Sequence, residues 1–548
     1  MKMKRNNKSR NNGLVSVLSI IMSTILSAGL LSGCGTAVNA ADRTSDTAAS
    51  EATAKDTNAR TLTIGSGQGC DTLDPLNAYD SWYSVRYGIC QTLTKMNDDM
   101  TISGWLADSY TVSDDNTVWT FEINDTAVFS NGNKLTAKSV KASLENVFAN
   151  CTRAEEYFTP LSIEADGQTL TITTEGAEPI LPNKLADPLF CIIDTSVDMT
   201  NIADEGPVGT GPFVVTSFDS ISKECIVSAN LNYWNGDVLL DSVDFIYTED
   251  QSALSWGLQA GDYDAVYNIG MTSIADFENN SDYTISRTAS GRTAHGFMNQ
   301  NGVLKDKALR EAILCMLDKE TYCSVLLNGQ YTAGKTLVTS AAPAYGYDEL
   351  SDPNSYDPDR AAQLLDDAGY IDIDDDGWRE TPEGEKLDLK YVYYTGRPEQ
   401  ELLVSATAQE LAVIGIKISA NVQETQTVID MLHAGEYDML CMSINVLNCA
   451  DPENHMRTYF ASDGEYNAYG WSDEAFDALL AKLSTESDPE ERVSLVKDAE
   501  QILLDDAVCI FYCYPIMNFV MKTGITGLES STADYYWISE NTAKTNVD

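Results

Sequence analysis

The chain has 548 residues, which is more than one hydrophobic core normally supports, so we expect two or three domains. Its 83 acidic and 35 basic side chains give a formal net charge of −48 at pH 7. This excess of negative charge favours solubility and argues against nucleic acid or an anionic membrane surface as a partner.

The first 33 residues are predicted to be a lipoprotein signal peptide and not part of the fold. Basic residues near the start precede an uncharged apolar stretch at residues 14–31, and Leu31-Ser32-Gly33-Cys34 is typical of a lipobox. Cys34 would then carry the lipid that anchors the protein outside the bacterial cell membrane. The alternative is a transmembrane anchor, because the apolar stretch is close to the lower spanning length.

Residues 34–60 are rich in Ala, Thr, Ser, Asp and Glu, which predicts a flexible tether. Eleven cysteines remain besides Cys34, and their spacing shows no metal-binding pattern. We expect most of them to be small buried apolar residues, with at least one free thiol or intermolecular bond because the number is odd. The sequence has three histidines and no Gly-x-Ser-x-Gly, phosphate-loop or HExxH motif, so an enzyme is not expected.

Ordered structure is predicted to begin with an apolar β-strand at residues 61–64. The loop Leu73-Asp74-Pro75 follows. Further along the chain, Thr136 is a predicted N-cap for a helix with an apolar stripe. The aromatic residues after the loop could face a ligand or equally belong to the core; they are Tyr79, Trp82 and Tyr83.

Residues 206–236 predict a β-hairpin that follows the tight turn Gly209-Thr210-Gly211-Pro212. The two glycines supply backbone freedom, and the proline prevents a helix. Strands are expected at residues 213–218 and 224–229, and the stretch closes at Asn232-Tyr233-Trp234-Asn235-Gly236. A hairpin alone would be compatible with an ordinary enzyme core.

The second half alternates helices and strands, which predicts an α/β lobe. Asp357, Pro358 and Gly369 mark the cap, first turn and end of one helix, and Asp306 is the predicted cap of another. A strand starting near residue 293 would leave the first lobe, and an apolar strand pair at 507–521 would return to it. Further strands are expected at 386–394, 416–422 and 437–444, and further helices near 400–412, 426–434, 473–484 and 489–503.

Together these motifs resemble the extracellular solute-binding proteins of family 5, the peptide and nickel receptors of ABC importers. Residues 208–236 resemble the signature VGTGPY…NPxYWxG, and residues 356–370 resemble YDPxKAxxLLxxAGY. The resemblance covers roughly residues 60–525. It implies an α/β, two-lobe periplasmic-binding-protein-like fold (type II, cluster C), a Venus-flytrap with a smaller inserted subdomain. The implied domains are lobe I at 61–292 with the subdomain at about 85–205, lobe II at 293–508, and a return segment at 509–548.

The resemblance also implies a function without catalytic residues. A monomeric lipoprotein would capture an oligopeptide or peptide-like solute between the lobes and deliver it to a membrane permease and its ATPase. A signalling-peptide sensor of the same fold and an extracellular hydrolase are the alternatives. The implied ligand-binding residues are Tyr79, Trp82, Tyr83, Arg153, His295, Asn445, Asn448 and Asp451.

This chain departs from the family at two positions that bear on the ligand. Peptide receptors of this type place an aspartate for the peptide's α-amino group where this chain has Asn448, and an amide accepts a weaker hydrogen bond. Arg153 matches an arginine with which the nickel receptors hold a metal chelate, whereas Asp187 replaces a second arginine. A nickel or other metal chelate is therefore the alternative ligand.

One acidic loop predicts a structural calcium site. Asp372, Asp374, Asp376 and Glu383, with Gly377 between them, fit the pattern D-x-D-x-D-G-x5-E, in which alternate oxygen ligands converge on one cation. The alternative is a solvated acidic turn. No other cofactor is expected.

Overall fold

The computed structural model describes residues 60–545. The predicted signal peptide, Cys34 and all of the predicted tether except Arg60 lie outside these residues. Within the described range, the helices are too short or too polar to cross a lipid bilayer.

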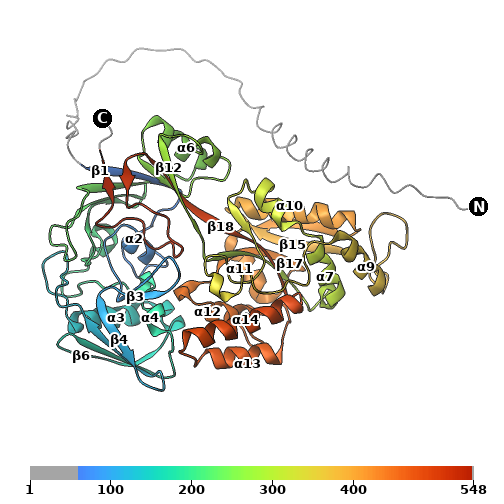
Figure 1. Cartoon of the computed structure of the whole chain (residues 1–548), viewed down its shortest axis with the longest axis horizontal. Coiled ribbons are helices and arrows are strands. Elements are labelled where there is room, and N and C mark those ends of the chain that lie inside the picture. The colour runs from blue at the N-terminus through green and yellow to red at the C-terminus, as the bar shows by residue number, and fades with distance from the viewer. Residues whose placement is uncertain (1–59, 546–548) are drawn as a thin grey trace, which may run out of the picture. The chain divides into compact units, whose positions relative to one another are not determined.

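A twelve-stranded mixed sheet connects two groups of elements, which we call lobe I and lobe II (Figure 1). Ten strands follow one path across it, and two more pair with the central strand β18. In path order the strands are β16 (Lys417–Gln423), β15 (Asp388–Tyr394), β17 (Met439–Asn445), β13 (Arg292–Met298), β18 (Cys509–Lys522), β11 (Ala265–Tyr267), β1 (Thr61–Ser66), β10 (Ser242–Tyr247), β9 (Glu224–Ala229) and β8 (Phe213–Asp219); the two others are β12 (Tyr283–Ala289) and β14 (Tyr331–Ala333).

The chain crosses between the lobes in β12–β13 and again in β18. The first half of β18 pairs with β13 of lobe II, and its second half pairs with β12 and β11 of lobe I. The sequence predicted a pair of strands here, but the structure has one continuous strand of 14 residues. Pro515 does not end the strand, because it lies where β18 changes partner from β13 to β12.

Lobe I contains a second sheet with its own buried core. It is antiparallel, in the order β4 (Ala107–Val112), β5 (Val118–Ile123), β7 (Thr169–Thr174), β6 (Pro160–Asp166), and it packs against helix α3 (Ala137–Asn150). The predicted cap of α3 is confirmed, since the side chain of Thr136 accepts a hydrogen bond from the Ser139 N–H at 3.2 Å. These elements fall in the range that the sequence assigned to the inserted subdomain.

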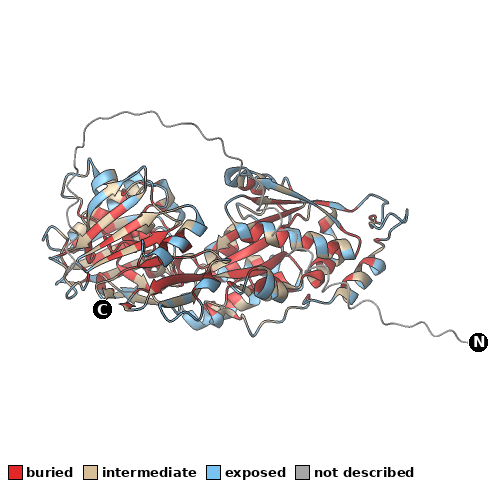
Figure 2. Ribbon diagram, turned by 90° about the horizontal axis from the view of Figure 1, so that it is seen from above, coloured by how far each residue is buried: buried red, intermediate tan, exposed pale blue. Residues whose placement is uncertain are grey.

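Helices surround the strands of lobe II, whose central strands are buried on both faces (Figure 2). The predicted helix boundaries agree closely: Asp357 caps α9, and Gly369 ends it with a φ of 86°. Asp306 likewise caps α7. The helices of this lobe are α7 (Lys307–Met316), α8 (Lys319–Thr321), α9 (Pro358–Ala368), α10 (Pro398–Val413), α11 (Thr425–Ala434), α12 (Glu453–Phe460), α13 (Glu474–Leu483) and α14 (Pro489–Asp505).

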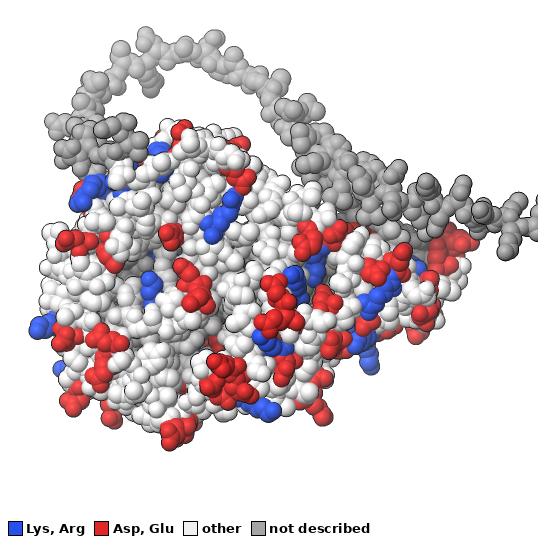
Figure 3. Space-filling model, viewed as in Figure 1, with Lys and Arg blue, Asp and Glu red and all other residues white. Residues whose placement is uncertain are grey.

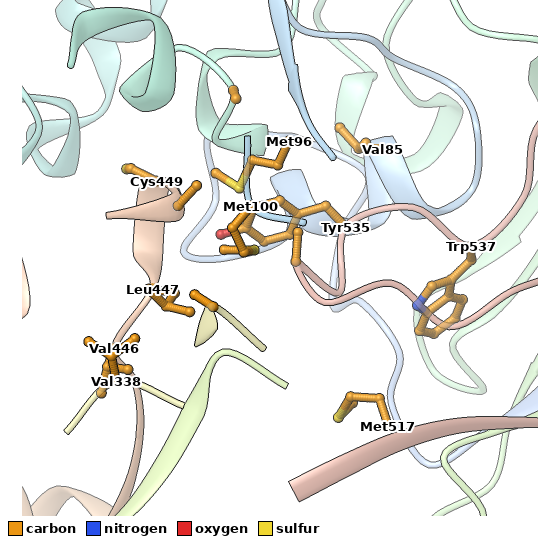
Figure 4. Close-up of a cluster of buried hydrophobic side chains, with 14 of the residues drawn as sticks. Val85, Met96, Met100, Val338, Val446, Leu447, Cys449, Met517, Tyr535 and Trp537 are labelled. Atoms are coloured by element: carbon orange, nitrogen blue, oxygen red, sulfur yellow. The ribbon is translucent and has the colours of Figure 1, made fainter. Parts of the chain in front are cut away.

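One apolar cluster contains residues of both lobes. Figure 4 shows Leu447 and Cys449 of lobe II on one side of the cluster, and Met96, Met100 and Tyr535 on the other. The lobes also share a hydrogen bond of 3.2 Å from the Asn116 side chain to the carbonyl of Thr485. The structure therefore has the lobes in contact.

All eleven described cysteines are buried and unpaired, which confirms their predicted place in the core. The remaining short elements are α2 (Ser81–Arg86), β2 (Thr94–Met96), β3 (Ile102–Gly104), α4 (Leu181–Lys184), α5 (Ile202–Glu205), α6 (Gln251–Ala260), β19 (Ile525–Thr526) and β20 (Ala543–Lys544).

Candidate ligand-binding cleft

A cavity of about 1270 Å³ lies between the two lobes. Its walls come from α2 and the segment around Arg153 in lobe I, from the end of β17 and the start of α12 in lobe II, and from β18. Both lobes and a crossing strand thus supply lining residues, so a change in the angle between the lobes would change the shape of the cavity.

The predicted Leu73-Asp74-Pro75 loop shapes the lobe I wall. The Asp80 carboxylate folds this loop by accepting hydrogen bonds from the Thr72 N–H at 3.2 Å and from the Asn77 amide at 2.8 Å. Helix α2 follows directly and presents its aromatic side chains to the cavity. Tyr79, Trp82 and Tyr83 all line it, and Tyr79 is 59% exposed.

Arg153 also lines the cavity and lies over the ring of Tyr79, 4.1 Å from its centroid. It donates one hydrogen bond to the carbonyl of Ala78. Its Nε and Nη2 atoms are buried and have no hydrogen-bond partner among the described residues. Two donors on a charged group are thus unsatisfied in this structure.

The lobe II wall contains the three other residues that the sequence placed together. Asn445 ends β17, and Asn448 and Asp451 follow in the next turn; all three line the cavity. The Asp451 carboxylate is already paired with Arg492 at 2.9 Å. Burial raises the pKa of Asp451, and the Arg492 guanidinium opposes that rise.

His295 is the predicted ligand residue that does not reach the cavity. It is 0% exposed and packs among Phe297, His455 and Phe511 in lobe II. Side chains alternate along a strand, so His295 points to the opposite face of β13 from Arg292, which does line the cavity. Burial lowers the pKa of His295 to about 4.

Sequence reasoning missed several lining residues of lobe II and the C-terminal segment. Arg292 begins β13, and Arg397 lies in the loop after the parallel strand β15. The position of Arg397 after a parallel strand could have identified it as a lining residue, because open α/β sheets bind ligands beyond the carboxyl ends of their strands. Asp534 comes from the segment that the sequence assigned only to the return of the chain.

A buried ion pair supports the cavity wall near Asp534. The Arg86 guanidinium, 1% exposed as a residue, pairs with the Asp534 carboxylate at 2.7 Å and lies against the rings of Trp82, Tyr83 and Trp537. Asp534 also accepts a hydrogen bond from the Tyr267 hydroxyl. These contacts fix α2 relative to the C-terminal segment.

The predicted calcium loop gathers three of its four residues. The carboxylate oxygens of Asp372, Asp374 and Asp376 lie within 4.8 Å of one another, and Glu383 is not among them. Glu383 lies apart from the three aspartates because the chain turns back between Thr381 and Glu385. The Lys386 ammonium lies 3.1 Å from Asp374 and also contacts Asp376. A basic side chain therefore already neutralises part of this cluster.

Two α/β lobes that are joined by crossing strands and enclose an interlobe cavity define the class of two-lobed solute-binding proteins. Residues 101–467 match the family described as bacterial extracellular solute-binding proteins, family 5 middle region. The chain belongs to this family, which is a family of receptors and not of enzymes.

Similar proteins fit this assignment. The chain is 26% identical over 437 residues to the nickel-binding protein NikA of Staphylococcus aureus (strain NCTC 8325 / PS 47), covering 80% of this chain and 85% of that protein. It is 25% identical over 503 residues to the glutathione-binding protein GsiB of Shigella dysenteriae serotype 1 (strain Sd197), covering 88% and 93%. The crystal structure of a nickel ABC transporter protein from Bacillus halodurans superimposes with a TM-score of 0.77 at 26% identity, covering 88% and 100%.

Proposed function

We propose that this protein is the substrate-binding lipoprotein of an ABC importer and that its solute is an oligopeptide or a peptide-like molecule. The size of the cavity is the observation that supports this most. Its volume of about 1270 Å³ exceeds the range of roughly 300–1,000 Å³ typical of small-molecule pockets, so a chain of several residues would fill it better than a compact chelate.

The lack of histidine ligands along the cavity also favours a peptide over a nickel chelate. All three histidines of the sequence are described, and none of them lines the cavity. Imidazole nitrogen is a common nickel ligand, so the protein would have to leave the metal to groups that the solute brings. A metal chelate remains the second candidate, because Arg153 offers free donors to chelate carboxylates and one relative is named for nickel.

Binding would work by closure of the lobes. A ligand shifts the equilibrium towards the closed form only if it binds that form more tightly than the open one. Aromatic side chains from lobe I and amides from lobe II meet across the cavity, so the full set of contacts forms only when the lobes are together. The solute would be released unchanged to the permease and ATPase, without catalysis.

A binding screen tests this proposal. Purified protein would be titrated with di- to hexapeptides, nickel–histidine and haem, first by thermal shift and then by calorimetry. We expect peptides to raise the melting temperature and to be recovered intact by mass spectrometry. If only the metal chelates stabilise the protein, the peptide assignment is wrong, and if the peptides are cleaved, the protein is a hydrolase.

Anchoring through Cys34 and the monomeric state are further parts of the proposal. Labelling cells with a fatty-acid analogue should mark the wild-type protein and not the Cys34→Ser variant, which should appear in the medium or periplasm. Size-exclusion chromatography with light scattering should give the mass of one chain. Label on the variant would contradict lipidation at this residue.

We also propose that calcium can bind the turn formed by Asp372, Asp374 and Asp376. The ion would have to displace the Lys386 ammonium, so we expect weak affinity in the millimolar range. The Lys386→Gln variant should bind calcium more tightly than the wild type in calorimetry. If neither protein binds it, the turn is a solvated acidic turn neutralised by Lys386.

A further inference from the structure

The basic residues of the cavity fall into two groups of equal size. Arg86, Lys184 and Arg457 each have a carboxylate partner within 4.0 Å. The other three have no such partner among residues 60–545, although they line the same cavity; they are Arg153, Arg292 and Arg397. Carboxylates lie near all three guanidinium groups but form no ion pair with them within 4.0 Å in the described chain, so these groups are the part of the cavity that an anionic ligand could still stabilise.

Arg153 belongs to the first of two candidate positions for an anionic group, where three hydrogen-bond donors lack acceptors. Trp82 Nε1, Arg153 Nε and Arg153 Nη2 are all buried without a partner in the described chain. Tyr79 lies between the two residues: Arg153 lies over its ring, and the ring contacts Trp82 with centroids 5.7 Å apart. Three donors and no acceptor suit a group with several oxygen lone pairs, such as a carboxylate.

The second position holds two arginines that repel each other. Burial, followed by the charge of Arg397, lowers the pKa of Arg292. Among the residues that the structure describes, the Arg292 guanidinium makes only a long hydrogen bond of 3.5 Å to the Ser443 carbonyl. Arg397 has Glu399 and the Tyr394 hydroxyl near it, but it forms no ion pair within 4.0 Å in the described residues. An anion between the two guanidinium groups would remove the repulsion.

By the same 4.0 Å criterion, four of the eight acidic residues of the cavity have a basic partner, and the other four are stabilised by hydrogen bonds or by solvent. Asp451 and Glu453 pair with Arg492, and Asp534 pairs with Arg86. The others either pair with a basic side chain, accept hydrogen bonds from neighbouring groups, or lie exposed at the rim; they are Glu178, Asp187, Glu399, Glu156 and Glu249. Asn448 adds no negative charge.

We propose that the solute of this receptor carries two acidic groups, one bound by Arg153 and Trp82 in lobe I and the other by Arg292 and Arg397 at the hinge and in lobe II. The proposal rests on the function proposed above and narrows its substrate class to dianionic peptides or peptide-like molecules without a required free amino terminus. Since the two positions belong to different lobes, a dianion would contact both only when the lobes are closed, which would make the charge pattern a condition for closure.

The acidic outer surface does not prevent an anionic solute from binding in the cavity. Figure 3 shows acidic side chains spread over the visible face of both lobes, with fewer basic ones between them. Their repulsion is screened beyond a Debye length of about 8 Å at physiological ionic strength. Inside the cavity, the unpaired guanidinium groups are closer to the ligand than the outer surface is, so they would decide the affinity.

A matched series of peptides tests the charge requirement directly. The probes are succinyl-(Ala)n with two carboxylates, acetyl-(Ala)n with one, acetyl-(Ala)n-amide with none, and unmodified (Ala)n as the zwitterion, each with two to five alanines. We expect the succinyl series to bind at least about tenfold more tightly than the acetyl series in calorimetry, as a lost charge-assisted hydrogen bond predicts. The amides should bind weakest.

Substitution of the arginines then separates the two positions. Arg153→Gln and Arg292→Gln should each remove the preference for two carboxylates over one, and Arg292→Lys should restore part of it. Arg287→Gln is the matched control, because Arg287 is exposed, pairs with Glu278 and lies outside this cavity. Circular dichroism and the melting temperature check that each variant is folded.

The outcomes distinguish this inference from the proposed function. If peptides bind with affinities that do not depend on their number of carboxylates, the dianion inference is overturned and the peptide receptor stands. If the zwitterion binds most tightly, the inference is also overturned, because a free amino group is then recognised. If no peptide of any charge binds, both proposals are wrong.

Discussion

Two histidines occupy neighbouring positions in the core of lobe II. The ring centroids of His295 and His455 are 5.1 Å apart, and the Nε2 atom of each is buried without a hydrogen-bond partner in the described chain. His295 Nδ1 lies 2.9 Å from the Thr293 carbonyl, to which the neutral ring can donate. Burial lowers the pKa of His455 as well, and the charge of a protonated His295 lowers it further. Both rings are therefore neutral at pH 7.

These buried rings should make the protein sensitive to acid. Because the folded-state pKa of His295 is about 4 and its ordinary value is 6.5, the unfolded chain binds more protons between these values, and stability falls as pH drops through that window. The loss should reach about 3 kcal/mol. His295→Phe should remove this contribution from the dependence of urea unfolding on pH between about 6.5 and 4, and leave the contribution of His455. His433→Gln, at an exposed histidine, should leave it unchanged.

Glu410 predicts a dependence on pH in the opposite direction. Burial raises its pKa to about 7 from 4.5, although it accepts hydrogen bonds from the Tyr322 hydroxyl at 2.5 Å and from the Asp318 N–H at 3.2 Å. The folded state binds more protons between these two values, so stability is lost as pH rises through them. Glu410→Gln should keep both hydrogen bonds and stabilise the protein by about 3 kcal/mol at pH 8. A similar gain at pH 4.5 would contradict this explanation.

At the scale of elements, the glycine turn before β8 is fixed by close backbone contact. A Cβ atom on Gly211 would lie 2.1 Å from the carbonyl oxygen of Gly88, and one on Gly209 would lie 2.2 Å from that of Ile89. The Gly211 N–H donates to the Ile89 carbonyl at 2.9 Å. This turn therefore packs directly behind α2, which carries the aromatic wall of the cavity.

Gly211→Ala should consequently weaken both folding and binding. Backbone atoms cannot move aside as a side chain can, so we expect a loss of about 2 kcal/mol or more in the free energy of unfolding. Displacement of α2 should also lower ligand affinity in calorimetry. Gly176→Ala is the matched control, because no atom of residues 60–545 lies within 4 Å of its added Cβ and its φ is not positive. Equal stability of the two variants would refute the proposed contact.

Local signals explain why several elements could be predicted almost to the residue. Asp357, Pro358 and Gly369 determine the start and end of α9 through a side-chain cap, a fixed φ and a left-handed C-terminus. Strand β18 was predicted less well, because its partners are distant in sequence and no local signal shows that one strand changes partner at Pro515.

At the scale of the whole molecule, the cavity depends on the relative position of the lobes. The structure has them in contact through Asn116 and Thr485 and through a shared apolar cluster. If the solute binds this form preferentially, its addition should increase the population of closed molecules. The eleven described cysteines are buried, so dyes should react selectively with cysteines that are introduced at the surface.

Energy transfer between dyes on the two lobes would measure closure. With Cys34→Ser as background, Glu164→Cys in lobe I and Glu385→Cys in lobe II provide exposed labelling sites. We expect ligand to increase the transfer efficiency, and a pair within lobe II, Asp359→Cys with Glu385→Cys, to show no change. Ligand binding without any change between the lobes would contradict capture by closure.

The sequence and the resemblance together placed seven of the eight predicted ligand residues along the cavity, and the reason for the exception is physical. His295 lies away from the cavity because the face of a strand on which a side chain lies depends on register, which the sequence did not reveal. Arg292 and Arg397 were missed because their segments meet only through the pairing of β13, β17 and β15, and Asp534 was missed because its partners Arg86 and Tyr267 are distant in sequence. Whether a guanidinium group has an ion-pair partner cannot be read from the sequence, so the three unpaired arginines could be recognised only in the structure.

Strand β18 contributes backbone hydrogen bonds to the sheets of both lobes. Loss of structure in one half would therefore expose unpaired amide and carbonyl groups at the edge of the other. We therefore expect the lobes to unfold as one cooperative unit, and neither lobe to fold well as an independent fragment. A binding protein built in this way can move its halves while keeping a single folding transition.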